Sequence, residues 1–219
     1  MKKIRQVIVD GRGESKKCIN IMHNSIDLFK KIASVEFQKP ILFTPDFEYT
    51  SDKIKSIAIE KLSYDQYNHF LLDLVDYWPD DSYLMLCQPD GYPIIAENWM
   101  DEFLNYDYIG APWQHSHFIN RVGNGGFSIR SKKYLDACKI LFDDFPMIAK
   151  YHNCEDFLCT NIYYHEMISL GITFAPLDLA AKFSYENPIA ERLFGVDQCF
   201  GLHDFVNGPV HEKIKYRIE

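Results

Sequence analysis

One aspartate follows directly after the most continuous apolar run of the chain. The run is Tyr83–Cys87, and Asp90 comes three residues later in the segment Gln88-Pro89-Asp90-Gly91. Such a run is typical of a strand buried on both faces of a sheet, and α/β sheets bind ligands at the carboxyl ends of their strands. Magnesium and manganese ions are commonly held by one or two carboxylates together with substrate phosphate oxygens. Asp90 is therefore a candidate ligand of a divalent ion, and the alternative is a Pro-Asp-Gly turn selected for its turn chemistry alone.

A second group of candidates lies in the glycine-rich segment from Tyr106 to Arg130. It contains four of the chain's 11 glycines, and Asn124-Gly125-Gly126 stands near its end. Paired glycines permit positive φ angles, and they let a ligand approach the backbone because no Cβ stands in the way. The alternative for the glycine pair is a wide hairpin with a bulge. Trp113 of the same segment is expected to be exposed, with burial in the core as its alternative.

Three short clusters of ionisable residues occupy predicted element boundaries or loops. Asp10-Gly11-Arg12 follows the first predicted strand, where ligands of α/β sheets bind, and an exposed turn is its alternative. Glu155 and Asp156 begin a predicted helix, whose dipole favours acidic residues there and is expected to lower the pKa of Asp156. His115 and His117 alternate in the glycine-rich segment and could ligate a metal ion, although solvated loop side chains are the simpler interpretation.

The elements that position these residues alternate between strands and helices. Hydrophobic periodicity predicts strands over residues 4–10, 40–44, 54–59, 83–87, 125–130, 172–175 and 179–185, with a further strand ending at residue 109. It predicts helices over residues 15–33, 132–142 and 157–170, and one that starts at the capping box of Ser63 and stops before Pro79. This alternation predicts an α/β fold with a mixed, mainly parallel central sheet flanked by helices, as one domain over residues 1–219.

The composition is that of an ordered globular protein. Apolar residues make up 47% and aromatic residues 15% of the 219 residues, which excludes a disordered chain. The net charge of −8 argues against a nucleic-acid binder but not against an anion held locally by backbone amides and a metal ion. Six scattered cysteines without a CxxC pair indicate reduced thiols inside a cell. We find no apolar run long enough for a signal peptide or a transmembrane segment.

Several segments together resemble the domain-of-unknown-function family 5672, which looks like GT-A glycosyltransferases. They occur in the family's order and span most of the chain, and the Gly-Ala-Pro-Trp and Gly-Asn-Gly-Gly parts are the specific ones. The segments are Tyr67–Leu72, Leu86–Asp90, Asp107–Trp113, Gly123–Arg130, Glu155-Asp156 and Phe200–His203. The resemblance implies a single Rossmann-like GT-A domain.

The resemblance also implies roles for individual residues. GT-A enzymes usually carry Asp-x-Asp after a buried strand, so only Asp90 of Gln88-Pro89-Asp90 matches the metal-binding carboxylate, and His203 matches a late histidine that completes the coordination. Asp156 matches the catalytic base of inverting members, and Glu155 is the competing candidate. The residues implied or expected to bind the donor are Asp10, Gly11, Arg12, Gln88, Trp113, Asn124, Gly125 and Gly126.

By this resemblance the protein is expected to move a sugar from a nucleotide-sugar donor to a glycan or lipid-linked glycan acceptor, with inversion and with Mn²⁺ or Mg²⁺, in bacterial surface polysaccharide synthesis. Glycosyl transfer needs a stabilised leaving diphosphate, a base for the acceptor hydroxyl and alignment of the two substrates. Two alternatives remain: a catalytically silent sugar- or nucleotide-binding domain, which suits the incomplete Asp-x-Asp, and a metal-dependent phosphohydrolase. A cytoplasmic location is expected, with or without peripheral contact at the inner face of the membrane.

Overall fold

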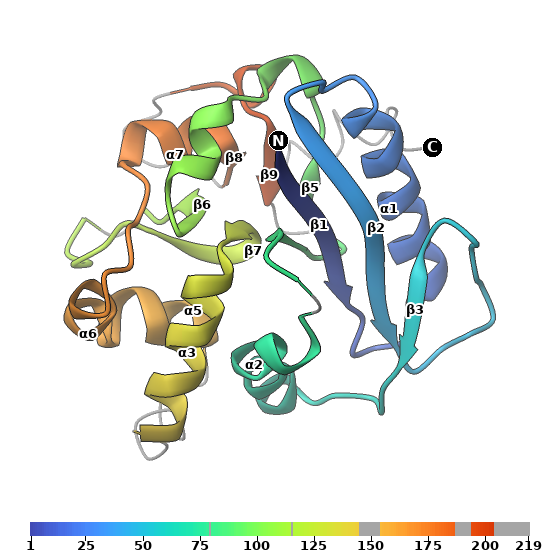
Figure 1. The fold of residues 1–219 in the computed structure, drawn as a ribbon, viewed down its shortest axis with the longest axis horizontal. Helices are drawn as coiled ribbons and strands as arrows, with labels where there is room; N and C mark the ends of the chain where they lie inside the picture. The colour runs from blue at the N-terminus through green and yellow to red at the C-terminus, as the bar shows by residue number, and fades with distance from the viewer. Residues whose placement is uncertain (79, 115, 145–153, 187–193, 204–219) are drawn as a thin grey trace.

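A computed structural model describes the chain except for residues 79, 115, 145–153, 187–193 and 204–219. The strands of its central sheet are β1 (Lys2–Val9), β2 (Val35–Thr44), β3 (Lys55–Ala58), β4 (Tyr83–Cys87), β6 (Tyr108–Pro112) and β7 (Val122–Arg130). They are arranged in the order β3-β2-β1-β4-β7-β6 (Figure 1). The first four pair in parallel, and β7 runs antiparallel to both β4 and β6. The predicted mixed, mainly parallel sheet is therefore confirmed.

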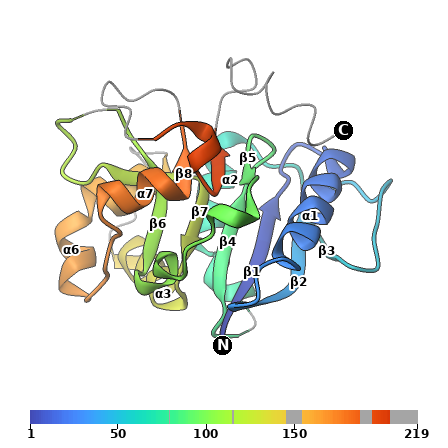
Figure 2. The same cartoon turned by 90° about the horizontal axis from the view of Figure 1, so that it is seen from above.

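Helices and a smaller sheet surround this centre. The helices are α1 (Ser15–Phe29), α2 (Tyr64–Leu72), α3 (Lys132–Asp144), α5 (Glu155–Phe157), α6 (Tyr164–Ser169) and α7 (Leu177–Phe183). The smaller sheet has the order β5-β9-β8 and consists of β5 (Gly91–Pro93), β8 (Ser184–Tyr185) and β9 (Gly201–His203). In both views α1 and α6 lie at opposite ends of the molecule (Figures 1 and 2). Within the described residues, every helix is too short or too polar to cross a membrane.

Two hydrophobic clusters, one on each face of the central sheet, hold these layers together. Successive side chains of β4 point to opposite faces, as in any strand. Leu84 and Leu86 pack in the cluster that includes α2 and α3, whereas Met85 and Cys87 pack in the cluster that includes α1. All four side chains are fully buried, and burial of one large apolar side chain contributes about 1.5–3 kcal/mol. The apolar run thus forms the doubly buried strand that its pattern predicts.

The second strand begins well before its predicted start and contains a proline. Its pairing with β1 moves from Arg5–Gln38 to Val7–Ile41, so β2 carries one extra residue between these pairs. Pro40 lies in this irregularity. A β-bulge tolerates proline because the extra residue leaves the ladder of hydrogen bonds, to which proline has no N–H to donate.

The last part of the chain departs from the predicted elements. Residues 179–185 mainly form α7 rather than a strand, because adjacent alanines favour a helix and a short apolar run does not discriminate between the two structures. Residues 172–175 contribute only an isolated bridge at Phe174. The helix predicted over 157–170 is interrupted by a π-helical turn over Leu158–Ile162, a feature often found near functional sites.

The burial of the cysteines gives a test of this packing. Cys154 is exposed and the other five thiols are buried, and burial raises the pKa of Cys18, Cys87 and Cys199 to about 12 each. Because the thiolate is the reactive form, we expect a thiol reagent to label Cys154 alone within a brief exposure of the folded protein. The readout is the intact mass, with Cys154→Ser as the control that removes the fast site. Rapid labelling of two or more thiols would contradict this packing.

Candidate functional site

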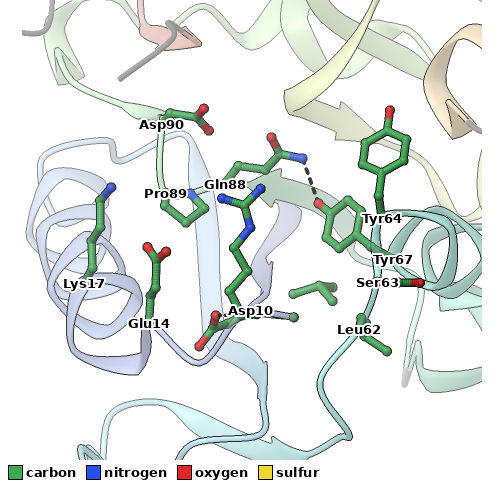
Figure 3. Close-up of a pocket in the computed structure, with 13 residues that line it drawn as sticks. Asp10, Glu14, Lys17, Leu62, Ser63, Tyr64, Tyr67, Gln88, Pro89 and Asp90 are labelled. Carbon is green, nitrogen blue, oxygen red and sulfur yellow. Dashed lines mark hydrogen bonds between the residues drawn. The ribbon is translucent and has the colours of Figure 1, made fainter. Parts of the chain in front are cut away.

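A cleft of about 380 Å³ opens at the carboxyl ends of β1 and β4. Figure 3 shows Lys17 and Asp90 on one wall and Tyr64 and Tyr67 on the opposite wall. Arg12 also lines the cleft. The structure thus brings the loop after β1 and the turn after β4 to one cavity, whose charged lining consists of two basic and three acidic side chains: Arg12, Lys17, Asp10, Glu14 and Asp90.

The loop after β1 is shaped by Asp10. The Gly13 N–H and the Thr44 hydroxyl each donate a hydrogen bond to this carboxylate at 2.9 Å, and Gly13 has a φ of +87° that favours glycine. Gly11 lies so close to Leu62 that a Cβ on it would stand 3.0 Å from the leucine Cβ. Asp10 and Gly11 therefore fix the loop that carries Arg12 to the cleft.

The segment after β4 is a tight turn that also directs Asp90. Reciprocal backbone hydrogen bonds join Gln88 and Gly91, at 2.9 and 3.0 Å. The segment is therefore the predicted turn, and this turn is compatible with Asp90 as a candidate metal ligand. The Gln88 amide donates to the Tyr67 hydroxyl at 2.7 Å. Gly91 pairs with His203 between β5 and β9, and this pairing brings His203 Nε2 to 3.9 Å from Asp90 Oδ1. The pairing of β5 with β9 in the smaller sheet therefore brings the two proposed metal ligands together.

The imidazole of His203 lies against glycine backbone. A Cβ on Gly126 would come within 2.1 Å of His203 Nε2, and a Cβ on Gly91 within 2.8 Å of the ring. Among the described residues, only Gly13 and Gly171 have positive φ, so Gly125 and Gly126 do not use the positive angles that glycine permits. Both lie in β7, where the absence of a Cβ accommodates neighbouring side chains of this chain.

Glu186 is a further carboxylate beside His203, and it is not among the residues predicted from the sequence. Its Oε1 accepts a hydrogen bond from the Asn124 amide at 2.8 Å and lies 3.6 Å from His203 Nδ1. Burial alone would lower the pKa of His203, but Glu186 and then Asp90 and Asp156 raise it overall. Glu186 follows directly after the predicted strand 179–185. A carboxylate just after a predicted strand is the signal that identified Asp90, and it could have identified Glu186 as well.

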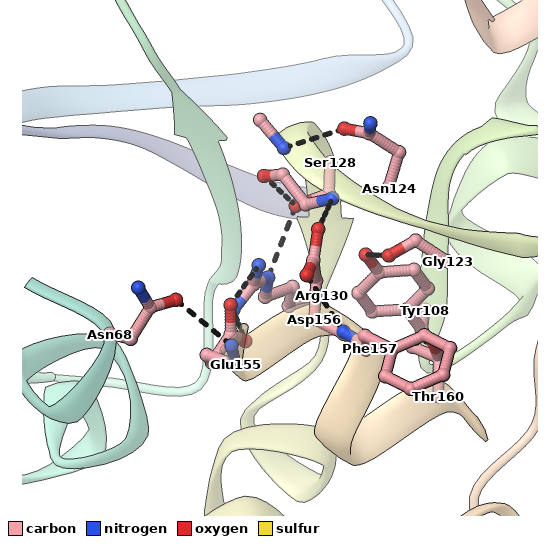
Figure 4. Close-up of polar contacts among 12 residues, drawn as sticks. Asn68, Tyr108, Gly123, Asn124, Ser128, Arg130, Glu155, Asp156, Phe157 and Thr160 are labelled. Atoms are coloured by element: carbon pink, nitrogen blue, oxygen red, sulfur yellow. Dashed lines mark hydrogen bonds and ion pairs between the residues drawn. The ribbon is translucent and has the colours of Figure 1, made fainter. Parts of the chain in front are cut away.

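Asp156 lies against the same strand segment (Figure 4). The Gly125 N–H donates to Asp156 Oδ2 at 2.9 Å, and a Cβ on Gly125 would stand 2.9 Å from the Cβ of Asp156. Burial raises the pKa of Asp156, although the amides of Gly125 and Phe157 oppose the shift. The expected lowering by the helix dipole is therefore wrong, because desolvation outweighs it, and the carboxylate is a stronger base than predicted.

Glu155 is buried in an ion pair instead of facing the cleft. Its carboxylate accepts two hydrogen bonds from Arg130, at 2.5 and 3.3 Å, and the two side chains are 3% and 0% exposed. Its backbone N–H donates to Asn68 Oδ1 at 2.9 Å, and Arg130 Nε donates to the Ser128 hydroxyl at 3.1 Å (Figure 4). Of the two candidate bases, this geometry favours Asp156.

Trp113 is only partly exposed. Its ring packs edge-on against Phe118 and tilted against Phe157, with centroids 5.2 and 5.8 Å apart. A Cβ on Gly123 would come within 2.5 Å of the indole. His117 is exposed, and His115 lies outside the described residues. The tryptophan therefore belongs to an aromatic cluster beside α5, with part of its surface left open.

Asp90 and His203 fit a divalent ion with few protein ligands. Ligand atoms about 2.1 Å from one ion can be 3.9 Å apart, as Asp90 Oδ1 and His203 Nε2 are. No group of three or more His, Cys, Asp or Glu in the described part of the chain has metal-holding geometry. Such an ion would therefore take its remaining ligands from substrate phosphates and water, as magnesium usually does.

Solved structures with the same fold are glycosyltransferases. A glycosyltransferase involved in the glycosylation of the major capsid of PBCV-1 aligns over 97% of both chains, with 12% identity and a TM-score of 0.56. An active-site mutant of LgtC, a galactosyltransferase, aligns over 94% of this chain and 88% of that chain, with 9% identity and a TM-score of 0.51. Mouse xyloside xylosyltransferase 1 aligns over 94% and 99%, with 11% identity and a TM-score of 0.49. The fold is that of the GT-A-type glycosyltransferases.

A family model described as a protein of unknown function (DUF5672) matches residues 52–203, and the chain belongs to this family. The match includes Asp90, Asn124, Asp156 and His203, whereas the loop with Arg12 lies before it. No protein of curated function matches the sequence.

The ion pair of Glu155 gives a prediction that separates structure from catalysis. Glu155→Gln leaves the Arg130 charge buried without its counter-charge, so we expect the free energy of unfolding to fall by about 3–5 kcal/mol. Urea denaturation measures the change, with Glu166→Gln on the exposed face of α6 as the matched control. A loss equal to that of the control would show that the pair does not hold the site together.

Proposed function

We propose that this protein is a glycosyltransferase that moves a sugar from a nucleotide-sugar donor to a glycan or lipid-linked glycan acceptor. The observation that carries the proposal is the arrangement along β7. Gly125 binds Asp156 through its N–H, and Gly126 lies against His203, which in turn faces Asp90 across 3.9 Å. A base and an ion site would thus lie on opposite sides of one strand, with Asp90 lining the cleft, on a fold whose solved members include glycosyltransferases.

The cleft is the proposed donor site. Arg12 and Lys17 would balance the charge of a nucleoside diphosphate, and the partly open ring of Tyr64 could stack on a base. Gln88 is held by Tyr67, so its amide oxygen is oriented for a polar group of the donor. The diphosphate would then lie next to Asp90, at the end of the cleft nearest His203.

Asp90 and His203 would hold Mn²⁺ or Mg²⁺ on the diphosphate. When bound, the ion would act as a Lewis acid that stabilises the leaving nucleoside diphosphate. Asp90 lines the cleft and is 25% exposed, whereas His203 is not among the described residues that line it and is 13% exposed. Partial burial strengthens the electrostatic attraction between the Asp90 carboxylate and a divalent cation.

Asp156 is the proposed general base of an inverting transfer. Its Oδ2 is held by the Gly125 N–H and its Oδ1 by the Phe157 N–H, at 2.9 and 2.7 Å, so the carboxylate has one orientation. From there it would accept the proton of the acceptor hydroxyl as the sugar is transferred. Positioned acid–base groups of this kind contribute about 10²–10⁴-fold to a rate.

We place this activity in bacterial surface polysaccharide synthesis, in the cytoplasm or at the inner face of the membrane. The test is the release of free nucleoside diphosphate from a panel of nucleotide-sugars with manganese and an oligosaccharide mixture. Release that depends on the acceptor supports transfer. Ligand-induced thermal stabilisation without any turnover would instead favour a silent binding domain, and release of inorganic phosphate would favour a phosphohydrolase.

The ion site is tested by Asp90→Ala. We expect this variant to lose the manganese-dependent rise in Tm that a nucleoside diphosphate gives by mass action, while the ligand-free Tm stays close to that of the wild type. Asp81→Ala, in an exposed position before β4, is the matched control. An unchanged manganese-dependent shift in Asp90→Ala would remove this residue from the ion site.

The base is tested by Asp156→Asn, which keeps the size and the hydrogen bond to Gly125. We expect turnover to fall by about 10²-fold or more at nearly unchanged donor affinity. Burial raises the pKa of Asp156. On acidification, the wild-type rate should therefore begin to fall at a higher pH than it would with an ordinary aspartate. The pH–rate profile of the variant should lack this acidic decrease.

Asp52→Asn, in the exposed loop before β3, controls for the loss of a surface charge. Wild-type turnover in Asp156→Asn would remove the base assignment.

A further inference from the structure

Glu186 has contacts that connect the two halves of the candidate site. Its Oε1 accepts from the Asn124 amide at 2.8 Å and lies 3.6 Å from His203 Nδ1. Its side chain is only 13% exposed. It follows β8, which pairs in parallel with β9, so the pairing of these two short strands sets its distance from His203.

The two nitrogens of His203 face different carboxylates. Nδ1 faces Glu186, whereas Nε2 faces Asp90 Oδ1 at 3.9 Å. The two nitrogens lie on different edges of the ring, so an ion held by Nε2 and Asp90 would lie away from Glu186. A neutral histidine binds a metal through the nitrogen that carries no proton, and the hydrogen bond of the other nitrogen decides which one that is.

The ring itself has little freedom to turn. The backbone of Gly126 lies so near that a Cβ there would be 2.1–2.7 Å from three ring atoms. The backbone of Gly91 is also close to the ring, since a Cβ there would be 2.8 Å from His203 Cδ2. With the ring confined in this way, the main remaining variable is the nitrogen on which the proton lies.

We propose that Glu186 is a positioning residue that fixes the proton of His203 on Nδ1 and so leaves Nε2 free to bind a divalent ion with Asp90. An ionised carboxylate only accepts hydrogen bonds, so a proton on Nδ1 satisfies it and a proton on Nε2 does not. The Asn124 amide holds the same oxygen in place and thereby ties the ion site to the strand that also carries Gly125 and Asp156. The role in ion binding rests on the function proposed above.

The position of the proton is measured by ¹⁵N NMR of the histidine ring in the metal-free protein, at a pH high enough for the ring to be neutral. The wild type is expected to carry the proton on Nδ1, and Glu186→Ala is expected to move a large part of the population to Nε2. Glu166→Ala, which removes an exposed glutamate of α6, should change nothing. A wild-type proton on Nε2, or an unchanged tautomer in Glu186→Ala, would overturn the inference, and the first of these results needs no variant.

Manganese binding alone, followed by electron paramagnetic resonance, gives the second readout. Loss of the group that orients a metal-binding histidine typically weakens binding about 10- to 100-fold, and we expect a decrease of this size in Glu186→Ala and none in Glu166→Ala. Equal affinity in wild type and Glu186→Ala would overturn the role in ion binding. If the wild type binds no manganese but shows the expected tautomers, the metal-assisted function fails while the positioning of His203 by Glu186 stands.

Discussion

The buried ion pair between Arg130 and Glu155 is the interaction on which the candidate site depends. Two full charges that are almost inaccessible to water hold the end of β7 to the first residue of α5, and removal of either would leave the other uncompensated. The arginine also lies over the rings of Tyr108 and Tyr134, 5.6 and 5.7 Å from their centroids. Because α5 begins at Glu155, this anchor sets the position of the next residue, Asp156, against β7.

Three consecutive residues of β7 then contact the ionisable side chains of the candidate site. Asn124 holds Glu186, Gly125 binds Asp156, and Gly126 leaves room for the ring of His203. The glycines are required by the protein's own side chains, since a Cβ on Gly125 would overlap Asp156 and one on Gly126 would overlap His203. The strand therefore supports the proposed base, Asp156, on one side and the proposed metal ligand His203 on the other, and rigid support is what alignment in catalysis requires.

The sequence was sufficient for the main sheet and for the position of Asp90 at its ligand edge, because their signals are local. The run Tyr83–Cys87 has the pattern of a doubly buried strand, and Asp90 follows it at the ligand edge of the sheet. The contact between Asp90 and His203 depends on the pairing of β5 with β9, which no local pattern specifies. Glu155 and Asp156 have the same local signal, and only the distant Arg130 separates their roles. The helix α7 was missed because a short apolar run fits either secondary structure.

The most direct test of this account is a crystal structure with manganese and a nucleoside diphosphate, in which anomalous scattering locates the ion. We predict one strong peak within bonding distance of both Asp90 and His203, about 2.0–2.3 Å from each ligand atom, with the diphosphate in the cleft beside Arg12 and Asp156 on the far side of Gly125. A manganese peak elsewhere, or a nucleotide bound outside the cleft while Asp90 and His203 hold no ion, would contradict the account.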